Sequence, residues 1–314
     1  MKKISALWLL LIIVIGFYGC NLGDKEKVDS ETVRKKVNPG YLNEKTGLRI
    51  SSFNSVECGY LYFNYSKDGK IDYLCGPEGE DKCYFNDSND TISGHFSESN
   101  YNSDVVYALG YNENGYLEKA SISISYQEGD GVNISSMSRR GGFSFSYGDN
   151  GHLEQLSYSE RRIWYSRNEV TSNFLSTISA KFVWNNNVIQ RMEVVTKDNK
   201  HDSERTRKEI YNFIYDNPDY INIYGQITPF TALFLYDGLD LFTCLGWLGI
   251  GPEMLPSRMT GEFENIVNGK TESNSDAANF HYDFTGDGAV LRCFLGEGKD
   301  SWYCDFSYDY GVVK

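Results

Sequence analysis

Few side chains in this sequence have both the type and the spacing that catalysis requires. The four histidines form no H-E-x-x-H pattern, and neither a G-x-S-x-G elbow nor a P-loop occurs. Carboxylates are abundant, but no pair is singled out by its position, so a carbohydrate-active hydrolase is an alternative without assigned catalytic residues. We therefore favour a protein that is not an enzyme, and we expect no catalytic residue and no cofactor.

The first twenty residues, MKKISALWLLLIIVIGFYGC, have the pattern of an export signal. Two lysines precede an apolar run that ends at Phe17 and is too short to cross a bilayer comfortably. The following Gly-Cys20 resembles the lipobox of bacterial lipoproteins, in which the thiol is acylated and anchors the mature chain to a membrane. We expect removal of residues 1–19, lipidation of Cys20 and a flexible tether over 20–38. An ordinary signal peptide or an uncleaved anchor is the alternative.

Six more cysteines follow Cys20, and an even number in an exported chain permits disulfides. If LRCFLGEGKDSWYCDF forms a hairpin about its central Gly-Lys, Cys293 lies opposite Cys304, and we predict a disulfide between them. Cys75 and Cys83 are the next candidates. Zinc is the alternative, but no C-x-x-C pattern occurs and no histidine is near any of these cysteines, so we expect no zinc site.

Asp283-Phe-Thr-Gly-Asp-Gly288 resembles the first half of a calcium-binding loop. The twelfth position, where such a loop needs Glu, is Phe294. A turn in which Asp and Gly satisfy the backbone explains the segment equally well, so we expect no metal.

The aromatic surplus is the feature with the widest functional reach. The chain contains 24 Tyr, 18 Phe and 5 Trp, and aromatic faces can stack on sugar rings while polar side chains bind the hydroxyls. Because tyrosine also favours strands, cross-strand packing of these rings is the alternative. The candidate ligand-binding residues are Tyr116, Tyr158, Arg161, Arg162, Trp164 and Tyr165.

Composition limits the class of protein. A chain of 314 residues with 40% hydrophobic and 23% charged side chains is long enough for a sizeable core. Its 30 Lys and Arg against 43 Asp and Glu give a net charge of −13, which argues against nucleic-acid binding.

A short repeat predicts the elements that position these residues. Tyr65, Tyr111 and Tyr147 are each followed four residues later by Gly and six residues later by an aliphatic residue. In a β-hairpin the Tyr would end one strand, the Gly would supply the positive φ of a tight turn of the primed type, and the aliphatic residue would begin the return strand. The fold class predicted is mainly β: an extended antiparallel meander of repeated hairpins, curled or rolled on itself, in one domain over 39–314.

The stretch from Pro229 to Gly251 breaks the two-residue alternation. Leu235, Leu239 and Phe242 follow at helical spacing, and Pro252 would end a helix. We predict one or two short helices near 230–250 that cover a face of the sheet, with a pair of buried strands as the alternative.

The Tyr-x-x-x-Gly units, the lipobox and GIGPEMLPSRM at 249–259 together resemble Bacteroidetes outer-membrane lipoproteins of unknown function built on YD-repeat-like hairpins. The resemblance covers about 48–314 and implies an outer-membrane address, at the cell surface rather than the periplasmic face. It transfers no catalytic residues. Asp-Thr91-Ile resembles the O-glycosylation sequon of Bacteroidetes, which would place Thr91 on the surface.

The function predicted from these observations is that of a lipid-anchored envelope protein with a binding or scaffolding role. Its partner at the envelope would be a glycan or a protein. A carbohydrate-active hydrolase and a purely structural envelope protein are the alternatives.

Overall fold

The computed structural model describes residues 41–310 except 44–46, 56–58, 68, 77–81, 87, 89, 99–100, 130–134, 168, 201–202, 225–241, 243–245 and 297–301. It contains seventeen β-strands. Their bounds are β1 Tyr41–Asn43, β2 Leu48–Ser55, β3 Gly59–Tyr65, β4 Ile71–Cys75, β5 Lys82–Phe85, β6 Thr91–Glu98, β7 Tyr101–Tyr111, β8 Leu117–Glu128, β9 Ser135–Tyr147, β10 Leu153–Ser166, β11 Glu169–Asn185, β12 Val188–Lys200, β13 Ser203–Ile214, β14 Arg258–Val267, β15 Lys270–Phe284, β16 Val290–Leu295 and β17 Trp302–Tyr310.

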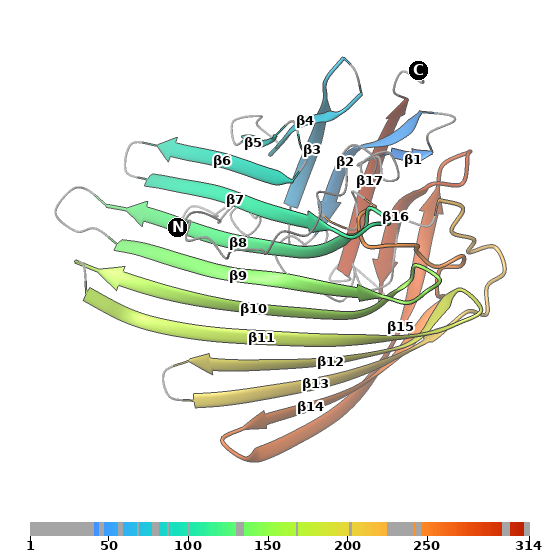
Figure 1. Ribbon diagram of the computed structural model, residues 1–314. Helices are drawn as coiled ribbons and strands as arrows, with labels where there is room; N and C mark the ends of the chain where they lie inside the picture. The colour runs from blue at the N-terminus through green and yellow to red at the C-terminus, as the bar shows by residue number, and fades with distance from the viewer. Residues whose placement is uncertain are drawn as a thin grey trace.

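Sixteen of these strands, β2 to β17, close into an antiparallel barrel (Figure 1). Each pairs with its neighbours in the chain, and β17 also pairs with β2, where Phe306 lies opposite Phe53. The short β1 adds to β2. Closure pairs the two edges that a meander would leave with unpaired backbone groups.

The predicted fold class is therefore wrong, because the hairpins form a closed barrel and not a curled meander with helices. Most of 230–250, where one or two short helices were expected, lies outside the described residues. Within its described part Phe242 alone has helical backbone, and 246–250 form turns and bends. No helix among the described residues is long and apolar enough to cross a membrane.

The three repeat turns contain the predicted glycine with positive φ. Gly69, Gly115 and Gly151 have φ of 86°, 81° and 79°. In each turn the glycine N–H donates to the carbonyl three residues earlier, at 2.9–3.0 Å. No non-glycine residue of these turns has positive φ among those described. The pattern is that of a type I turn followed by a left-handed glycine and a bulge, not of the primed turn expected.

The aromatic residue of the repeat forms a hydrogen bond between successive hairpins. Tyr147 donates its hydroxyl to the carbonyl of Leu117, which is the aliphatic residue of the preceding unit. In the following units the indole N–H of Trp184 donates to the carbonyl of Leu153, and the hydroxyl of Tyr215 donates to the carbonyl of Ile189. Tyr65 donates in the same way to Ile50, and Tyr308 to Val290. These hydrogen bonds are 2.5–2.8 Å long. The repeat thus encodes a link between neighbouring units as well as a turn.

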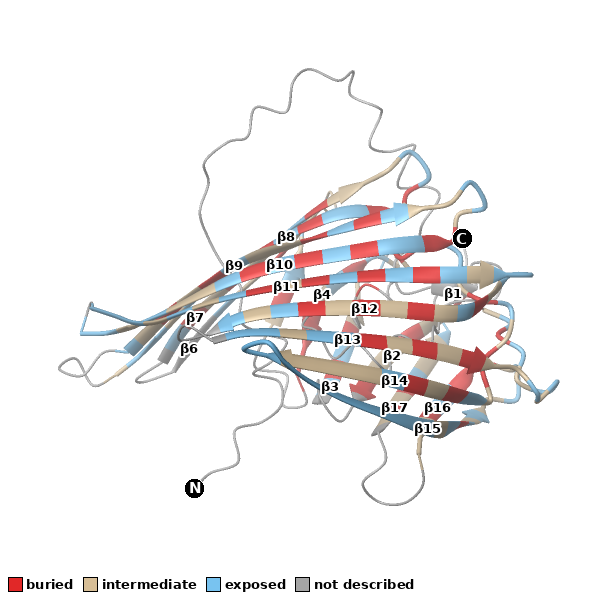
Figure 2. Cartoon of the chain, turned by 90° about the horizontal axis from the view of Figure 1, so that it is seen from below, coloured by how far each residue is buried: buried red, intermediate tan, exposed pale blue. Residues whose placement is uncertain are grey.

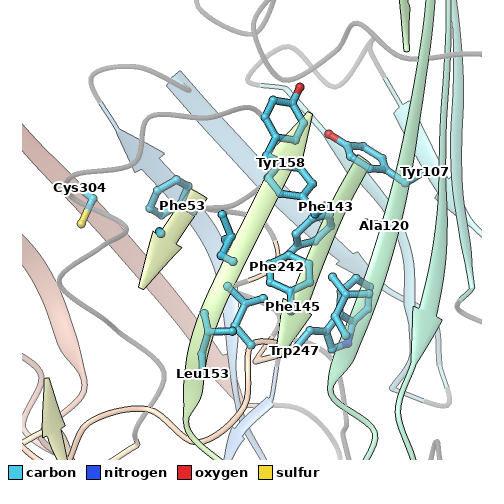
Figure 3. Close-up of a cluster of buried hydrophobic side chains, with 14 of the residues drawn as sticks. Phe53, Tyr107, Ala120, Phe143, Phe145, Leu153, Tyr158, Phe242, Trp247 and Cys304 are labelled. Atoms are coloured by element: carbon cyan, nitrogen blue, oxygen red, sulfur yellow. The ribbon is translucent and has the colours of Figure 1, made fainter. Parts of the chain in front are cut away.

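The apolar side chains fill the interior of the barrel. Along β8, buried Ala120, Ile122 and Ile124 alternate with polar residues, as a strand with one buried face requires. One cluster of buried side chains draws on strands all round the ring. Phe242 and Trp247, from the connection between β13 and β14, are buried in this cluster (Figure 3).

Contacts of that connection fix its place at the end of the barrel where the repeat turns lie. The ring of Phe242 meets the rings of Phe143 and Phe145 edge-on, with centroids 5.8 and 6.2 Å apart. The N–H of Ile250 donates to the carbonyl of Gly151 at 2.9 Å. A Cβ on Gly249 would stand 2.4 Å from that same carbonyl oxygen, so only glycine permits this approach.

The outer face of the wall is polar. Figure 2 shows buried residues alternating with exposed residues along β10 and β11, and mainly with intermediate residues along β12. On β10 the exposed positions include Gln155, Ser157 and Ser159, between buried Leu156 and Tyr158. On β10 the barrel thus carries most of its apolar residues inward and its exposed hydroxyl and amide groups outward.

Candidate functional site

A shallow groove of about 400 Å³ lies across β9, β10, β11 and β12. Its centre is a rung of three serines, because Ser157 on β10 lies directly opposite Ser144 on β9 and Ser179 on β11. All three are exposed, on the face of the strands opposite to the buried Phe145 and Leu156. The groove is therefore on the outer wall.

Small side chains line much of the groove, and the strands that carry them are long and curved (Figure 2). Gln155 and Lys181 form the next rung, and Lys181 lies opposite Glu193 on β12. The groove presents hydroxyls that both donate and accept hydrogen bonds, one amide and one pair of opposite charges. These groups suit a ligand rich in hydroxyls.

Acid–base catalysis has little support in this groove. Glu193 is the one carboxylate among its described lining residues, and it forms an ion pair with Arg191 at 2.9 Å. A glycosidase of the usual kind needs two carboxyl groups across the scissile bond. No group of three or more His, Cys, Asp or Glu suited to a metal ion lies in the part of the chain described. The groove has the chemistry of a binding surface.

A second polar group lies on the inner face of the wall and is buried. Glu160 accepts hydrogen bonds from Arg139, from the Tyr158 hydroxyl at 2.6 Å and from Arg162 at 2.7 Å. Burial raises the pKa of Glu160, but the two guanidinium groups outweigh it and hold that pKa below its ordinary value. Burial raises the pKa of the Tyr158 hydroxyl. The side chains of Arg139 and Glu160 are 4% exposed, so this network supports the interior and is closed to a ligand.

The predicted ligand-binding residues do not form one site. Tyr158, Arg162 and Trp164 are on the inner face of β10, whereas Arg161 is on its outer face. Tyr165 follows a register shift after Trp164 and is half-buried.

Tyr116 lies apart from all of these, in the turn between β7 and β8, where its ring packs against Tyr147 with centroids 5.3 Å apart. Tyr158 has only 3% of its surface exposed, which excludes it from an aromatic platform. Of the predicted six, Arg161 alone is exposed on the same face of β10 as the groove.

Sequence reasoning missed the serines of the groove and a group of exposed tyrosines. The serine signal was present as Ser-x-Ser in strands that alternate, but which serines become neighbours depends on register. Tyr60, Tyr62 and Tyr84 are 48%, 37% and 49% exposed. Tyr60 and Tyr62 are nearly parallel, with ring centroids 6.2 Å apart. Both lie on β3, whose sequence is GYLYFNY. The alternate spacing of these tyrosines was the signal from which their common face could have been predicted.

The register predicted for the last hairpin is confirmed. Cys293 lies opposite Cys304, Phe294 opposite Tyr303, and Leu295 opposite Trp302. Both cysteines are buried, and the structure records them as free thiols. The disulfide between them stays a prediction.

The other predicted bridge has a less favourable register. Cys83 lies opposite Leu74, and Cys75 opposite Lys82. Directly opposed residues share a face of a sheet and neighbours alternate, so Cys75 and Cys83 project to opposite faces. Both are buried free thiols. This geometry disfavours a bridge between them.

Three further features were singled out in the sequence: the glycosylation sequon at Thr91, the calcium-like segment and the N-terminal signal. Thr91 begins β6 and donates its hydroxyl to Asp90 at 3.1 Å, and its glycosylation stays a prediction. In the calcium-like segment, Gly288 donates to the carbonyl of Thr285 at 3.0 Å and has φ of 82°, which is the hairpin-turn alternative. Cys20, the signal at 1–19 and the tether at 20–38 lie outside the described residues.

Comparison with known proteins adds little to this description. No protein-family model matches the sequence, and no curated protein matches it either. Among solved structures the chain is similar to a porin-like protein from Bacteroides uniformis, with 11% identity and a TM-score of 0.27, over 70% of this chain and 95% of that one. A score this low does not establish a shared fold, so the barrel described above rests on this chain's own strand pairing.

Proposed function

We propose that the protein is a lipid-anchored binding protein of the bacterial cell envelope whose outer-wall groove takes a glycan. The observation that carries the proposal is the serine rung at Ser144, Ser157 and Ser179. A glycan binds through many hydroxyls, and neighbouring serines offer donors and acceptors at the spacing of adjacent strands, about 4.8 Å. The groove is shallow and open. This shape suits an extended polysaccharide chain better than a small molecule that must be enclosed.

The lipid anchor is supported by the leader and the lipobox-like Cys20. An outer-membrane location reached through that lipid is compatible with a closed barrel. Attachment through the lipid would also leave the outer wall of the barrel in water, where it could bind a glycan. Protein assembly without a glycan and a purely structural role are the alternatives that the experiments must separate.

The binding experiment uses the full-length protein in detergent and a panel of neutral and acidic polysaccharides. Ser157→Tyr places a bulky side chain in the centre of the groove, and tyrosine is well tolerated in strands. We expect this variant to lose at least tenfold in affinity for whichever glycan the native protein binds. The matched control is Ser275→Tyr, at an exposed position of β15 away from the groove. Equal affinity in both variants, or no glycan bound at all, would overturn the proposal.

The anchor is tested separately in cells supplied with labelled palmitate. We expect label in the native chain and none in Cys20→Ala. Label in the variant would refute lipidation at this residue. Protease shaving of intact cells then reports the side of the membrane, and we expect loss of the protein because the proposed ligand lies outside.

A further inference from the structure

Three exposed tyrosines lie near one another on the outer wall of β3 and β5. On β3, Tyr60 and Tyr62 stand on either side of buried Leu61, so both rings project outward. On β5, Tyr84 follows Cys83, whose side chain belongs to the buried core, so Tyr84 projects outward as well.

Exposed aromatic side chains are rare elsewhere in the described part of the chain. Apart from these three tyrosines, only Trp164 and Tyr310 are found among its exposed large apolar residues. Trp164 is on the inner face of β10, and Tyr310, at the end of β17, donates its hydroxyl to Asp287. The exposed aromatic rings of the outer wall are therefore concentrated on β3 and β5.

The rings of this surface pack together in two pairs. Tyr60 and Tyr62 are nearly parallel, with an angle of 14° between their planes and centroids 6.2 Å apart. Tyr84 lies directly opposite Tyr73 of β4, with centroids 5.6 Å apart. The ammonium of Lys82 lies over the ring of Tyr73, 4.6 Å from its centroid. Tyr73 thus supports Tyr84, while the other three rings present their surface to solvent.

Each outward tyrosine lies directly opposite an uncharged hydrogen-bonding side chain on a neighbouring strand. The pairs are Tyr60–Asn54, Tyr62–Ser52, Tyr73–Asn64 and Tyr84–Ser93. Directly opposed residues share a face of the sheet, and amide and hydroxyl groups both donate and accept hydrogen bonds. Asn54 is buried, whereas Ser52, Asn64 and Ser93 are half-buried. The surface therefore places aromatic rings beside uncharged polar groups.

We propose that Tyr60, Tyr62 and Tyr84 form a second carbohydrate site, which binds a β-1,4-linked oligosaccharide of glucose or N-acetylglucosamine. The ring substituents of these sugars are equatorial, so both faces of each sugar present C–H groups that pack on an aromatic ring. Successive sugars of such a chain turn opposite faces to the same side, and the parallel rings of Tyr60 and Tyr62 accept both. Ser52, Asn64 and Ser93 would bind the hydroxyls at the rim of the sugars.

The spacing of the rings favours an oligosaccharide over a single sugar. Tyr84 is two strands away from Tyr62, which is at least about 10 Å across the sheet. A ligand that contacts both strands must therefore span more than one ring. The polar groups beside the tyrosines are uncharged, which favours a neutral ligand.

This site is separate from the serine groove. Strands β6, β7 and β8 lie between β5 and β9 in the ring (Figure 1), so the two sites share no residue. The inference goes beyond the proposed function, and each site binds without the other.

The test titrates cellohexaose and chitohexaose into the full-length protein, kept in a detergent without a sugar head group. We expect at least one of them to bind, and Tyr62→Ser and Tyr84→Ser each to lower its affinity at least about fivefold. Tyr62→Phe should retain the affinity, because this variant keeps the ring and loses only the hydroxyl. Equal affinity in the native protein and both serine variants would refute the site.

Two control variants separate this site from the rest of the protein. Tyr310→Ser removes an exposed tyrosine of β17, and Ser157→Tyr blocks the serine groove, so both should bind the hexasaccharide as the native protein does. A loss in Ser157→Tyr alone would place the sugar in the groove, which refutes the second site and leaves the proposed function intact. An equal loss in Tyr310→Ser would also overturn the assignment. So would the absence of binding, or binding of a proline decamer in place of both sugars.

Discussion

Replacement of Glu160 by glutamine should destabilise the barrel more than almost any other change of a single charge. Glu160→Gln keeps the shape of the side chain and removes its charge. Arg139 would then remain charged, with 4% of its side chain exposed, and its nearest anion would be gone. The second arginine, Arg162, is 35% exposed, so water can solvate it and it adds less to the loss.

The expected loss in the free energy of unfolding depends on the charge of Arg139, which remains buried when Glu160 is replaced. Removing one partner of a buried ion pair typically costs about 3–5 kcal/mol, because the other charge is left without compensation. Replacing both partners by apolar residues costs far less, so Arg139→Met with Glu160→Leu should recover most of the loss. About 1 kcal/mol should remain, since the Tyr158 hydroxyl loses the carboxylate that accepts its hydrogen bond.

The assay is chemical denaturation of the native protein, the single variant and the double variant, with Glu193→Gln as the exposed control. The pair of Glu193 with Arg191 is about two-fifths exposed on each side, and its loss should cost no more than about 1 kcal/mol. A loss below about 1 kcal/mol for Glu160→Gln, or a double variant less stable than the single one, would refute the reasoning.

The same variant has a defined pH dependence. The pKa of Glu160 is lowered on folding, so its ion pair stabilises the folded state fully above the ordinary carboxyl pKa of 4.5. That stabilisation is lost as the pH falls through the lower pKa of the folded state. The difference between native protein and Glu160→Gln should therefore be constant from pH 6 to 8 and shrink under acid conditions. A difference that grows on acidification would contradict the assignment of charge.

Two substitutions and one peptide-mapping experiment test the hairpin units. Gly115→Val should cost at least about 1 kcal/mol in denaturation, because Gly115 has φ of 81° and a β-branched residue resists positive φ; a neutral result would contradict this turn. Tyr147→Phe should cost about 0.5–1.5 kcal/mol, since the carbonyl of Leu117 loses the hydroxyl bonded to it, and unchanged stability would remove that role. Non-reducing peptide mapping of the exported protein should join Cys293 to Cys304, and two alkylatable thiols would refute the bridge.

Strand register was predictable from the sequence where the residues of a single hairpin determine it. The register that opposes Cys293 and Cys304 needs only the residues between them, and it is confirmed. Closure of the barrel was not predictable in this way. It depends on the pairing of β17 with β2, for example Phe306 with Phe53, which no local pattern specifies. Strand number, tilt and stagger must agree around the whole ring before such a pair can form.

Turn type was predicted less well than turn position. A primed two-residue turn was expected at the repeat glycines, but it occurs at Asn186-Asn187, where φ is 48° and 61°, and at Asn268-Gly269, where φ is 49° and 77°. At Gly115 the strands are joined by a longer loop with a bulge. Both arrangements need a residue that tolerates positive φ, so Asn and Gly mark the turn without deciding its type.

The candidate binding residues failed for a different reason. The segment 158–165 is dense in aromatic and arginine residues, and density in sequence was taken as proximity in space. A strand sends successive side chains to opposite faces, so Arg161 and Arg162 are neighbours in the chain and are separated by the wall of the barrel. The residues that do meet Ser157 come from β9 and β11, and their identity required the register.

Whether the outward-facing side chains are apolar or polar determines whether such a barrel can span a membrane. A membrane-spanning barrel turns apolar side chains outward over a band about 25 Å tall and keeps polar groups inside. Here most of the apolar residues of β8 to β11 are inside, and Lys119, Arg140, Arg161 and Lys181 face outward. Each Lys or Arg facing lipid at mid-membrane would cost about 2–4 kcal/mol. Under the proposed function, attachment to the membrane would come from outside the wall, as acylation of Cys20 would provide, and this arrangement would leave the groove and its cations in water.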